Sequence, residues 1–141
     1  MISEIRTYIK TFSELAGVDV MVEYLTNNVK CYSVNEATGY QPLIEKDITG
    51  NEKLQFQFNF DAKLYWNEEI QNNVDNSIFF EKFKKWLNDN NKAGVFPTFQ
   101  ASENIKPESI EATTNGYIFM AEADEAIYRI SCKFIYWKGD K

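Results

Sequence analysis

Residues 53–66 constrain the fold more than any other part of the chain, because they alternate strictly between apolar and polar side chains. Successive side chains of a β-strand point to opposite faces of a sheet, so a period of two predicts a long strand with one buried face. The predicted buried positions are Leu54, Phe56, Phe58, Phe60, Ala62, Leu64 and Trp66, and the polar positions between them are Gln55, Gln57, Asn59, Asp61 and Lys63.

A second alternating segment near the C-terminus predicts a hairpin. Tyr117–Ala121 and Ala126–Trp137 are the predicted strands, and residues 122–125 between them have a length suited to the turn. In the longer strand, Tyr128, Ile130, Cys132, Phe134 and Tyr136 share one face, while Arg129, Ser131 and Lys133 alternate with them on the other. Shorter strands are predicted at Val18–Leu25, Lys30–Val34 and Tyr40–Glu45.

Two amphipathic regions predict helices. In residues 3–16 apolar side chains recur every three or four positions, with Ser3 as a plausible N-cap and Gly17 as a plausible stop. Residues 67–74 predict a short helix, and residues 75–91 predict a longer one that ends at 90–94. Its apolar stripe consists of Phe79, Phe80, Phe83, Trp86 and Leu87. Pro97 and Pro107 bracket a predicted loop.

These elements predict a single domain over residues 1–141. The expected fold class is α/β of the α+β type: a mixed, mostly antiparallel sheet with the helices packed on one face. A length of 141 residues suits one compact domain, and a 44% share of hydrophobic residues is sufficient for a core. No apolar run approaches the ~20 residues that a membrane helix needs, and the N-terminus has no signal-peptide pattern, so we expect no membrane partner.

Charge and composition disfavour several classes of function. The formal net charge of −6 argues against a nucleic-acid binder, which needs a basic field. The chain has no His, so Ser-His-Asp and Cys-His catalysis cannot be built within it. Cys31 and Cys132 are too few for a disulfide framework or a Cys-rich zinc site, and we expect two buried free thiols.

Three groups of residues could carry chemistry, and each has a simpler structural explanation. Acidic residues that could pair for catalysis sit where helix starts and turns need polar groups; they are Glu68, Glu69, Glu122, Asp124 and Glu125. Asp89–Gly94 resembles the start of a calcium-binding loop, but Gln100 occupies the position of the chelating Glu. Lys82, Lys84, Lys85 and Lys92 fit a solvated helix face better than a phosphate site. We therefore predict no catalytic residues, no metal-binding residues and no cofactor, and expect that the chain is not an enzyme.

Protein contact is better supported by the pattern. Tyr65, Ile127, Ile135 and Trp137 fall on the otherwise polar faces of the two long strands. Aromatic and aliphatic side chains in such places are typical of protein–protein interfaces. Together with the amide side chains of Gln55, Gln57 and Asn59, they form our candidate subunit interface.

The pattern of residues 78–137 also carries a resemblance. It comprises Ile78–Leu87, Ser109–Ala112, Asn115–Phe119 and Ala126–Tyr136. This run resembles the minor capsid proteins of siphophages and prophages of Gram-positive bacteria, which are similar to tail-terminator proteins. The resemblance extends more loosely to the strand at 54–66. It consists of apolar and aromatic positions and includes no catalytic signature.

The resemblance implies a tail-terminator-like subunit that assembles as a ring, a hexamer, at the head-proximal end of a tail tube. There it would stop tube polymerisation and join the tube to the head. The implied partners are further copies of the chain, the tail tube protein and the head–tail connector, with DNA passing through the lumen without sequence-specific binding. The implied location is the host cytoplasm during assembly and then the virion. Two alternatives remain: a head-completion or neck protein on the portal side, and a non-viral intracellular protein-binding module.

Overall fold

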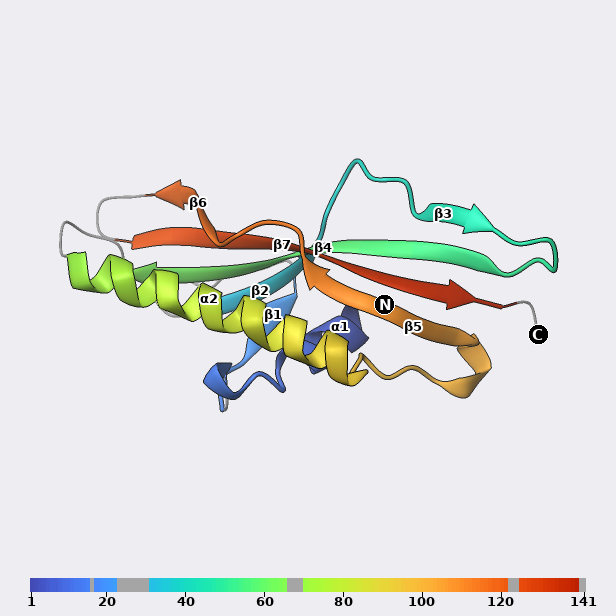
Figure 1. The fold of residues 1–141 in the computed structure, drawn as a ribbon. Helices are drawn as coiled ribbons and strands as arrows, with labels where there is room; N and C mark the ends of the chain where they lie inside the picture. Colours follow the sequence, from blue (N-terminus) through green and yellow to red (C-terminus); the bar gives the residue numbers. More distant parts are fainter. Residues whose placement is uncertain (16, 23–30, 66–69, 122–124, 140–141) are drawn as a thin grey trace.

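A seven-stranded sheet with helices on one face forms the described part of this computed structural model (Figure 1). The structure describes residues 1–15, 17–22, 31–65, 70–121 and 125–139, with the backbone alone described for 65 and 70–74. Its elements are α1 Ile2–Ile9, β1 Val20–Val22, β2 Cys31–Glu36, β3 Leu43–Lys46, β4 Glu52–Tyr65, α2 Ile70–Ala93, β5 Ile105–Ala112, β6 Tyr117–Ala121 and β7 Glu125–Lys138, with short 3₁₀ helices at Ser13–Leu15 and Ala101–Glu103.

The sheet is mixed and mostly antiparallel, which confirms the predicted fold class. Its strand order is β1-β2-β4-β7-β5, with β3 added to β4 and β6 added to β7. Only the β1–β2 pair is parallel among the described strands. The antiparallel β4–β7 pair stays in register from Glu52 opposite Lys138 to Tyr65 opposite Glu125. These two strands therefore form the long axis of the molecule (Figure 1).

The alternation predicted for the two long strands is confirmed in the described residues, and Trp66 lies outside them. The even-numbered residues of β4 and β7 face the helices, and most of them are buried: Phe56, Phe58, Phe60, Ala62, Leu64, Ala126, Tyr128, Ile130, Cys132 and Phe134. Because the register pairs even-numbered residues with each other, both strands contribute to one continuous apolar surface.

Aromatic contacts fix the helices on that surface. The ring of Phe83 on α2 stacks on that of Phe60 on β4, with centroids 4.7 Å apart. Phe83 also meets Phe12, which follows α1, edge to face at 5.5 Å. The ring centroids of Tyr8 on α1 and Trp86 on α2 are 5.1 Å apart. The same core thus includes α1, α2 and the sheet, with both helices on one face as predicted.

The N-terminal helix is shorter than predicted. We expected it over 3–16 with Ser3 as the N-cap, but α1 begins at Ile2 and ends at Ile9, with Met1 as its N-cap. The amides of Thr11 and Phe12 bond three residues back, and a 3₁₀ turn follows. This tighter turn still buries Phe12 and Leu15, so the apolar periodicity survives the change of helix type.

The prediction of two helices between 67 and 91 is wrong. A single helix, α2, runs from Ile70 to Ala93, and the predicted cap residues 75–77 lie inside it. Asp, Asn and Ser inside a helix cost less than about 0.7 kcal/mol each relative to Ala. Packing of the aromatic stripe outweighs that cost. The predicted end is confirmed, because Gly94 has a φ of +73° and the amide of Val95 bonds to the carbonyl of Asn90.

The predicted loop between the two prolines is wrong only at its end, from Ile105 onward. Residues Ile105–Ala112 form strand β5, which contains Pro107. A proline cannot donate a hydrogen bond to a neighbouring strand, so it is tolerated at sheet edges and irregularities. Among the described strands β5 pairs only with β7, and its register shifts between Pro107 and Ser109.

The shorter strands also differ at their ends from the prediction. Strand β1 covers 20–22 of the predicted 18–25, and residues 23–30 lie outside the described part. Strands β2 and β3 begin and end later than predicted. Strand β6 has the predicted bounds.

Candidate interface on the helix-free face

The predicted interface residues lie on one surface, the helix-free face, defined as the side of β4 and β7 opposite α1 and α2. The β4–β7 register places Gln55 directly opposite Ile135. Gln57 and Asn59 follow on β4, while Ile127 and Trp137 lie farther along β7 in the same set of odd-numbered residues. The backbone of Tyr65 pairs with Glu125, but its side chain lies outside the described residues.

All six described members of that set are half-buried, and the polar ones bond within the chain. Gln57 Nε2 donates to Gln55 Oε1 at 3.1 Å, and Gln55 Nε2 donates to the carbonyl of Gln41 at 2.7 Å. Asn59 Oδ1 accepts a 2.9 Å bond from the hydroxyl of Ser131. The amide row therefore has fixed donors and acceptors, and a partner would meet a preorganised surface.

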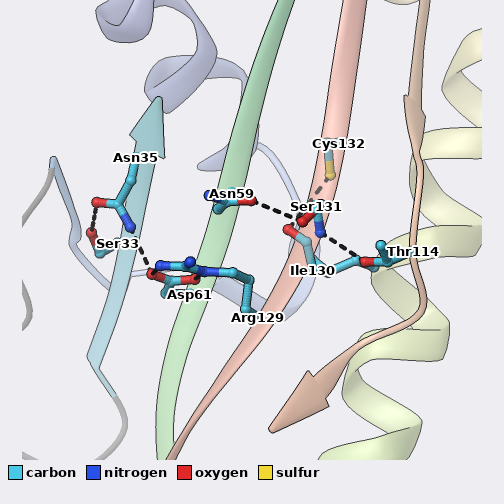
Figure 2. Close-up of polar contacts among 9 residues, drawn as sticks. All are labelled: Ser33, Asn35, Asn59, Asp61, Thr114, Arg129, Ile130, Ser131 and Cys132. Atoms are coloured by element: carbon cyan, nitrogen blue, oxygen red, sulfur yellow. Dashed lines mark hydrogen bonds and ion pairs between the residues drawn. The ribbon is translucent and has the colours of Figure 1, made fainter. Parts of the chain in front are cut away.

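An ion pair with a buried carboxylate lies on this face. Arg129 on β7 directly faces Asp61 on β4, and its Nε and Nη2 reach the two carboxylate oxygens at 2.8 and 2.9 Å (Figure 2). This bidentate geometry is the strongest form of an arginine–carboxylate pair. Asp61 is 3% exposed, so its carboxylate is largely shielded from solvent, whereas the Arg129 side chain is 19% exposed.

Further contacts connect the ion pair to neighbouring strands. Asn35 Nδ2 on β2 donates to Asp61 Oδ2 at 2.6 Å, and the Ser33 hydroxyl donates to Asn35 Oδ1 (Figure 2). On the other side, the ring of Phe119 from β6 covers the Arg129 guanidinium, with Cζ 3.7 Å from the ring centroid. The hydrogen bonds that Arg129 donates to Asp61 raise the pKa of the guanidinium above its usual range. The cluster thus links β2, β4, β7 and β6.

Two patches of exposed apolar side chains lie on edge strands, and the sequence analysis did not single them out. The β6 patch consists of Tyr117, Ile118, Phe119 and Met120, each 42–52% exposed. The β3 patch consists of Leu43, Ile44 and Ile48, the last of which is fully exposed in the turn after β3. A signal was present, since four consecutive apolar residues at 117–120 cannot all share one buried face of a strand.

A cavity of about 550 Å³ opens at the end of the sheet near the β3–β4 turn. Trp137, a predicted interface residue, lines it together with Phe99 and the polar side chains of Asn51, Asn104 and Lys106. A volume of this size with mixed lining is typical of a site that holds a small ligand or a side chain of a partner. Asp47 borders it, and hydrogen bonds from Thr49 and Asn51 lower the pKa of its carboxyl.

The candidate acidic, calcium-binding and lysine residues of the sequence analysis have structural roles wherever the structure describes them. Asp89, Asn90 and Asn91 lie within α2, where Asp89 pairs with Lys85 at 2.7 Å, so no calcium loop forms there. Lys82 contacts Glu14, and Lys84 donates to Asn115. Glu125 pairs with Lys63 at 3.3 Å, whereas Glu68, Glu69, Glu122 and Asp124 lie outside the described residues.

Both cysteines are buried thiols outside any disulfide, which confirms their predicted state. Burial raises the pKa of the Cys132 thiol far above its usual range, and a thiol that stays protonated is a poor nucleophile and metal ligand. In the described ranges, no three His, Cys, Asp or Glu side chains come together in a group able to hold a metal ion.

The helices that the structure describes are too short or too polar to cross a membrane. No protein-family model matches the chain, and no curated protein matches its sequence.

Proposed function

We propose that this chain is a tail terminator. Its copies form a ring, a hexamer, at the head-proximal end of a siphophage tail tube, stop the tube's growth and join it to the head. The protein would occupy the host cytoplasm during assembly and the head–tail junction of the virion afterwards. The resemblance of residues 78–137 to minor capsid proteins supports this assignment.

One structural observation carries the proposal. Two 14-residue strands, β4 and β7, have helices on one face over part of their length, while their other face has ordered polar groups and borders exposed apolar edges (Figure 1). A subunit that must contact like subunits and two different partners needs several such surfaces. The bidentate Asp61–Arg129 pair stiffens the helix-free face, which holds the candidate subunit-interface residues.

Charge is compatible with DNA passing through the ring. The chain carries a formal charge of −6, and like charges repel, so DNA would move through the lumen without sticking. Specific recognition of a base sequence is not part of the proposal.

The decisive experiment adds the purified chain to purified siphophage tail tubes and images their ends by negative stain. Light scattering across a wide concentration range gives the mass of the chain alone. We expect capped tube ends and a closed ring of about six subunits, either alone or on the tube. Tubes that grow and end as they do without the protein would overturn the proposal.

A double variant tests the helix-free face. Gln57→Glu plus Asn59→Glu places two negative charges in the amide row, where both side chains are half-buried, and we expect an intact fold without assembly. The matched control, Asn88→Glu plus Ser102→Glu, adds the same charge at exposed positions outside that row. Normal capping by the first variant would exclude this face from the interface.

Two alternative functions differ in partner. A head-completion or neck protein would bind purified portal rings and leave tail tubes uncapped. An intracellular protein-binding module would be a strict monomer, and the 550 Å³ cavity beside Trp137 is the observation that favours it, since a cavity of this size can hold a side chain of a partner.

A further inference from the structure

We infer that β6 of one copy pairs edge to edge with β3 of a second copy, so that subunits join head to tail through the β6 and β3 patches. The inference rests on the proposed function in that both require a self-assembling chain, and it names the surfaces that the proposed ring would use.

The two strands have free edges among the described elements. Strand β6 pairs only with β7, and β3 pairs only with β4. Edge strands normally carry charges or proline that discourage pairing with another chain. Strand β5 follows that rule with Lys106, Pro107, Glu108 and Glu111, whereas residues 117–121 of β6 contain no charge and no proline. Strand β3 has its charges, Glu45 and Lys46, in its second half, after the apolar Leu43 and Ile44. The edge of β6 is therefore suited to accept a further strand.

The outer strands pair with different halves of β4 and β7, and this arrangement leaves space beside β3 for a second copy. Strand β2 pairs with β4 at 58–63 and β3 pairs with it at 52–54, on the same side of β4. On the far side of β7, β5 pairs at 132–138 and β6 at 126–129. Strands β3 and β6 therefore lie on opposite edges and at opposite ends of the molecule (Figure 1). A copy shifted along the strands can place its β6 beside β3 without meeting β1 or β2.

The two patches match in area, as the two sides of one contact between copies must. At roughly 200 Å² for a fully exposed side chain of this size, the β6 patch presents about 400 Å² and the β3 patch a similar area. Each alone is within the range of about 300–600 Å² for the largest patch on a monomer. In a head-to-tail contact each copy contributes one patch of about 400 Å², so the total of about 800 Å² is half that of a standard interface. A single contact is therefore weak, and closure of the ring or the tail tube must add to it.

The presence of two patches also decides the symmetry. A two-fold dimer through β6 would leave the β3 patch of both copies in water. A head-to-tail contact buries both patches in one repeated interface, and such a contact closes into a ring when its rotation permits. The same geometry gives open filaments when the rotation does not close.

Site-specific crosslinking tests the contact. Met120→Cys and Ile44→Cys are prepared as separate variants, because both side chains are exposed and neither belongs to the Asp61–Arg129 cluster. Each variant alone, and the two mixed, are treated with a short bismaleimide. The unaltered chain is the control, since its own Cys31 and Cys132 are buried. We expect crosslinked dimers in the mixture and none in the single variants.

A variant that adds a charge tests the same contact without a crosslinking reagent. Met120→Lys introduces an edge charge of the kind that blocks strand pairing, and we expect the dissociation constant for self-association to rise at least about tenfold. Val95→Lys, an exposed apolar side chain outside both patches, is the matched control and should change it less than about twofold.

Several outcomes would overturn the inference. Crosslinking of Met120→Cys alone as strongly as in the mixture would show a two-fold dimer. Rings that form without any crosslink would mean that other surfaces join the subunits, and the proposed function would stand. A chain that stays monomeric with and without tail tubes, or whose β6 patch binds only a different protein, would also overturn it. The capping of tube ends tests the proposed function separately.

Discussion

Arg129 and Asp61 illustrate how single residues control the helix-free face. They are 68 positions apart in sequence and directly opposed in the β4–β7 register. Sequence analysis placed both on the polar faces of their strands but had no means of pairing them. The pairing depends on register, which is set over the whole length of the two strands.

We expect the two halves of this pair to respond unequally to mutation. Arg129→Met removes the charged partner of the Asp61 carboxylate, which is 3% exposed. We expect this to lower the free energy of unfolding by about 3–5 kcal/mol. Asp61→Asn keeps a polar side chain beside Asn35 and should cost less. Urea denaturation measures both. Joint replacement by Asp61→Leu and Arg129→Met should recover most of the loss, and simple additivity of the single effects would contradict this account.

Gly116 is a second residue whose identity is constrained by packing. A Cβ at this position would lie 2.5 Å from Cγ and 2.6 Å from Cβ of Phe80, which is buried on α2. We expect Gly116→Ala to lower the free energy of unfolding by about 1–3 kcal/mol, because the helix must shift away. Gly139→Ala meets only the end of the Asn51 side chain and is the control. A cost for Gly116→Ala no larger than the control's would show that the helix moves freely.

At the scale of elements, α2 is held by its aromatic stripe. Phe83 is fully buried between Phe12, Phe60 and Trp86, whereas Ile78 on the same helix is 40% exposed. Phe83→Ala should lower the free energy of unfolding by about 3–5 kcal/mol. Ile78→Ala should change it by less than about 1 kcal/mol, as measured by denaturant unfolding. Equal effects would mean that the stripe does not anchor the helix.

Elements also show where local sequence rules failed. The capping residues at 75–77 indicated a helix boundary, and the prolines at 97 and 107 indicated a loop. Both signals are local preferences of about 1 kcal/mol, and tertiary packing outweighed them. Strand β5 forms because β7 offers it a partner, which no window of sequence around Pro107 reveals.

At the scale of the whole molecule, tyrosine ionisation links the fold to alkaline pH. Burial, and then the hydrogen bond to Glu36, raise the pKa of Tyr40 to about 12. Burial also raises the pKa of Tyr8, Tyr32 and Tyr136. The unfolded chain ionises these groups near the usual value of about 10. Their contribution to stability is therefore complete below pH ~10 and is lost as pH rises through the folded values.

Two measurements check this alkaline behaviour. Ultraviolet absorbance of the phenolate should show part of the eight tyrosines ionising only above pH ~11, and together with the rest once the chain is unfolded in urea. Tyr40→Phe should reduce the loss of stability between pH ~10 and ~12. A single transition near pH ~10 in the folded protein would contradict the assigned burial.

The sequence by itself determined the elements whose pattern is local: the alternating strands β4 and β7, the apolar stripe of α2, the buried thiols and the α+β class. These follow from side-chain periodicity, which each segment carries on its own. The tertiary structure alone decided the β4–β7 register, the Asp61–Arg129 pair, the existence of β5 and the exposure of the β3 and β6 edges. Those features depend on which distant segment lies alongside, and that choice minimises the free energy of the whole chain rather than of any one segment.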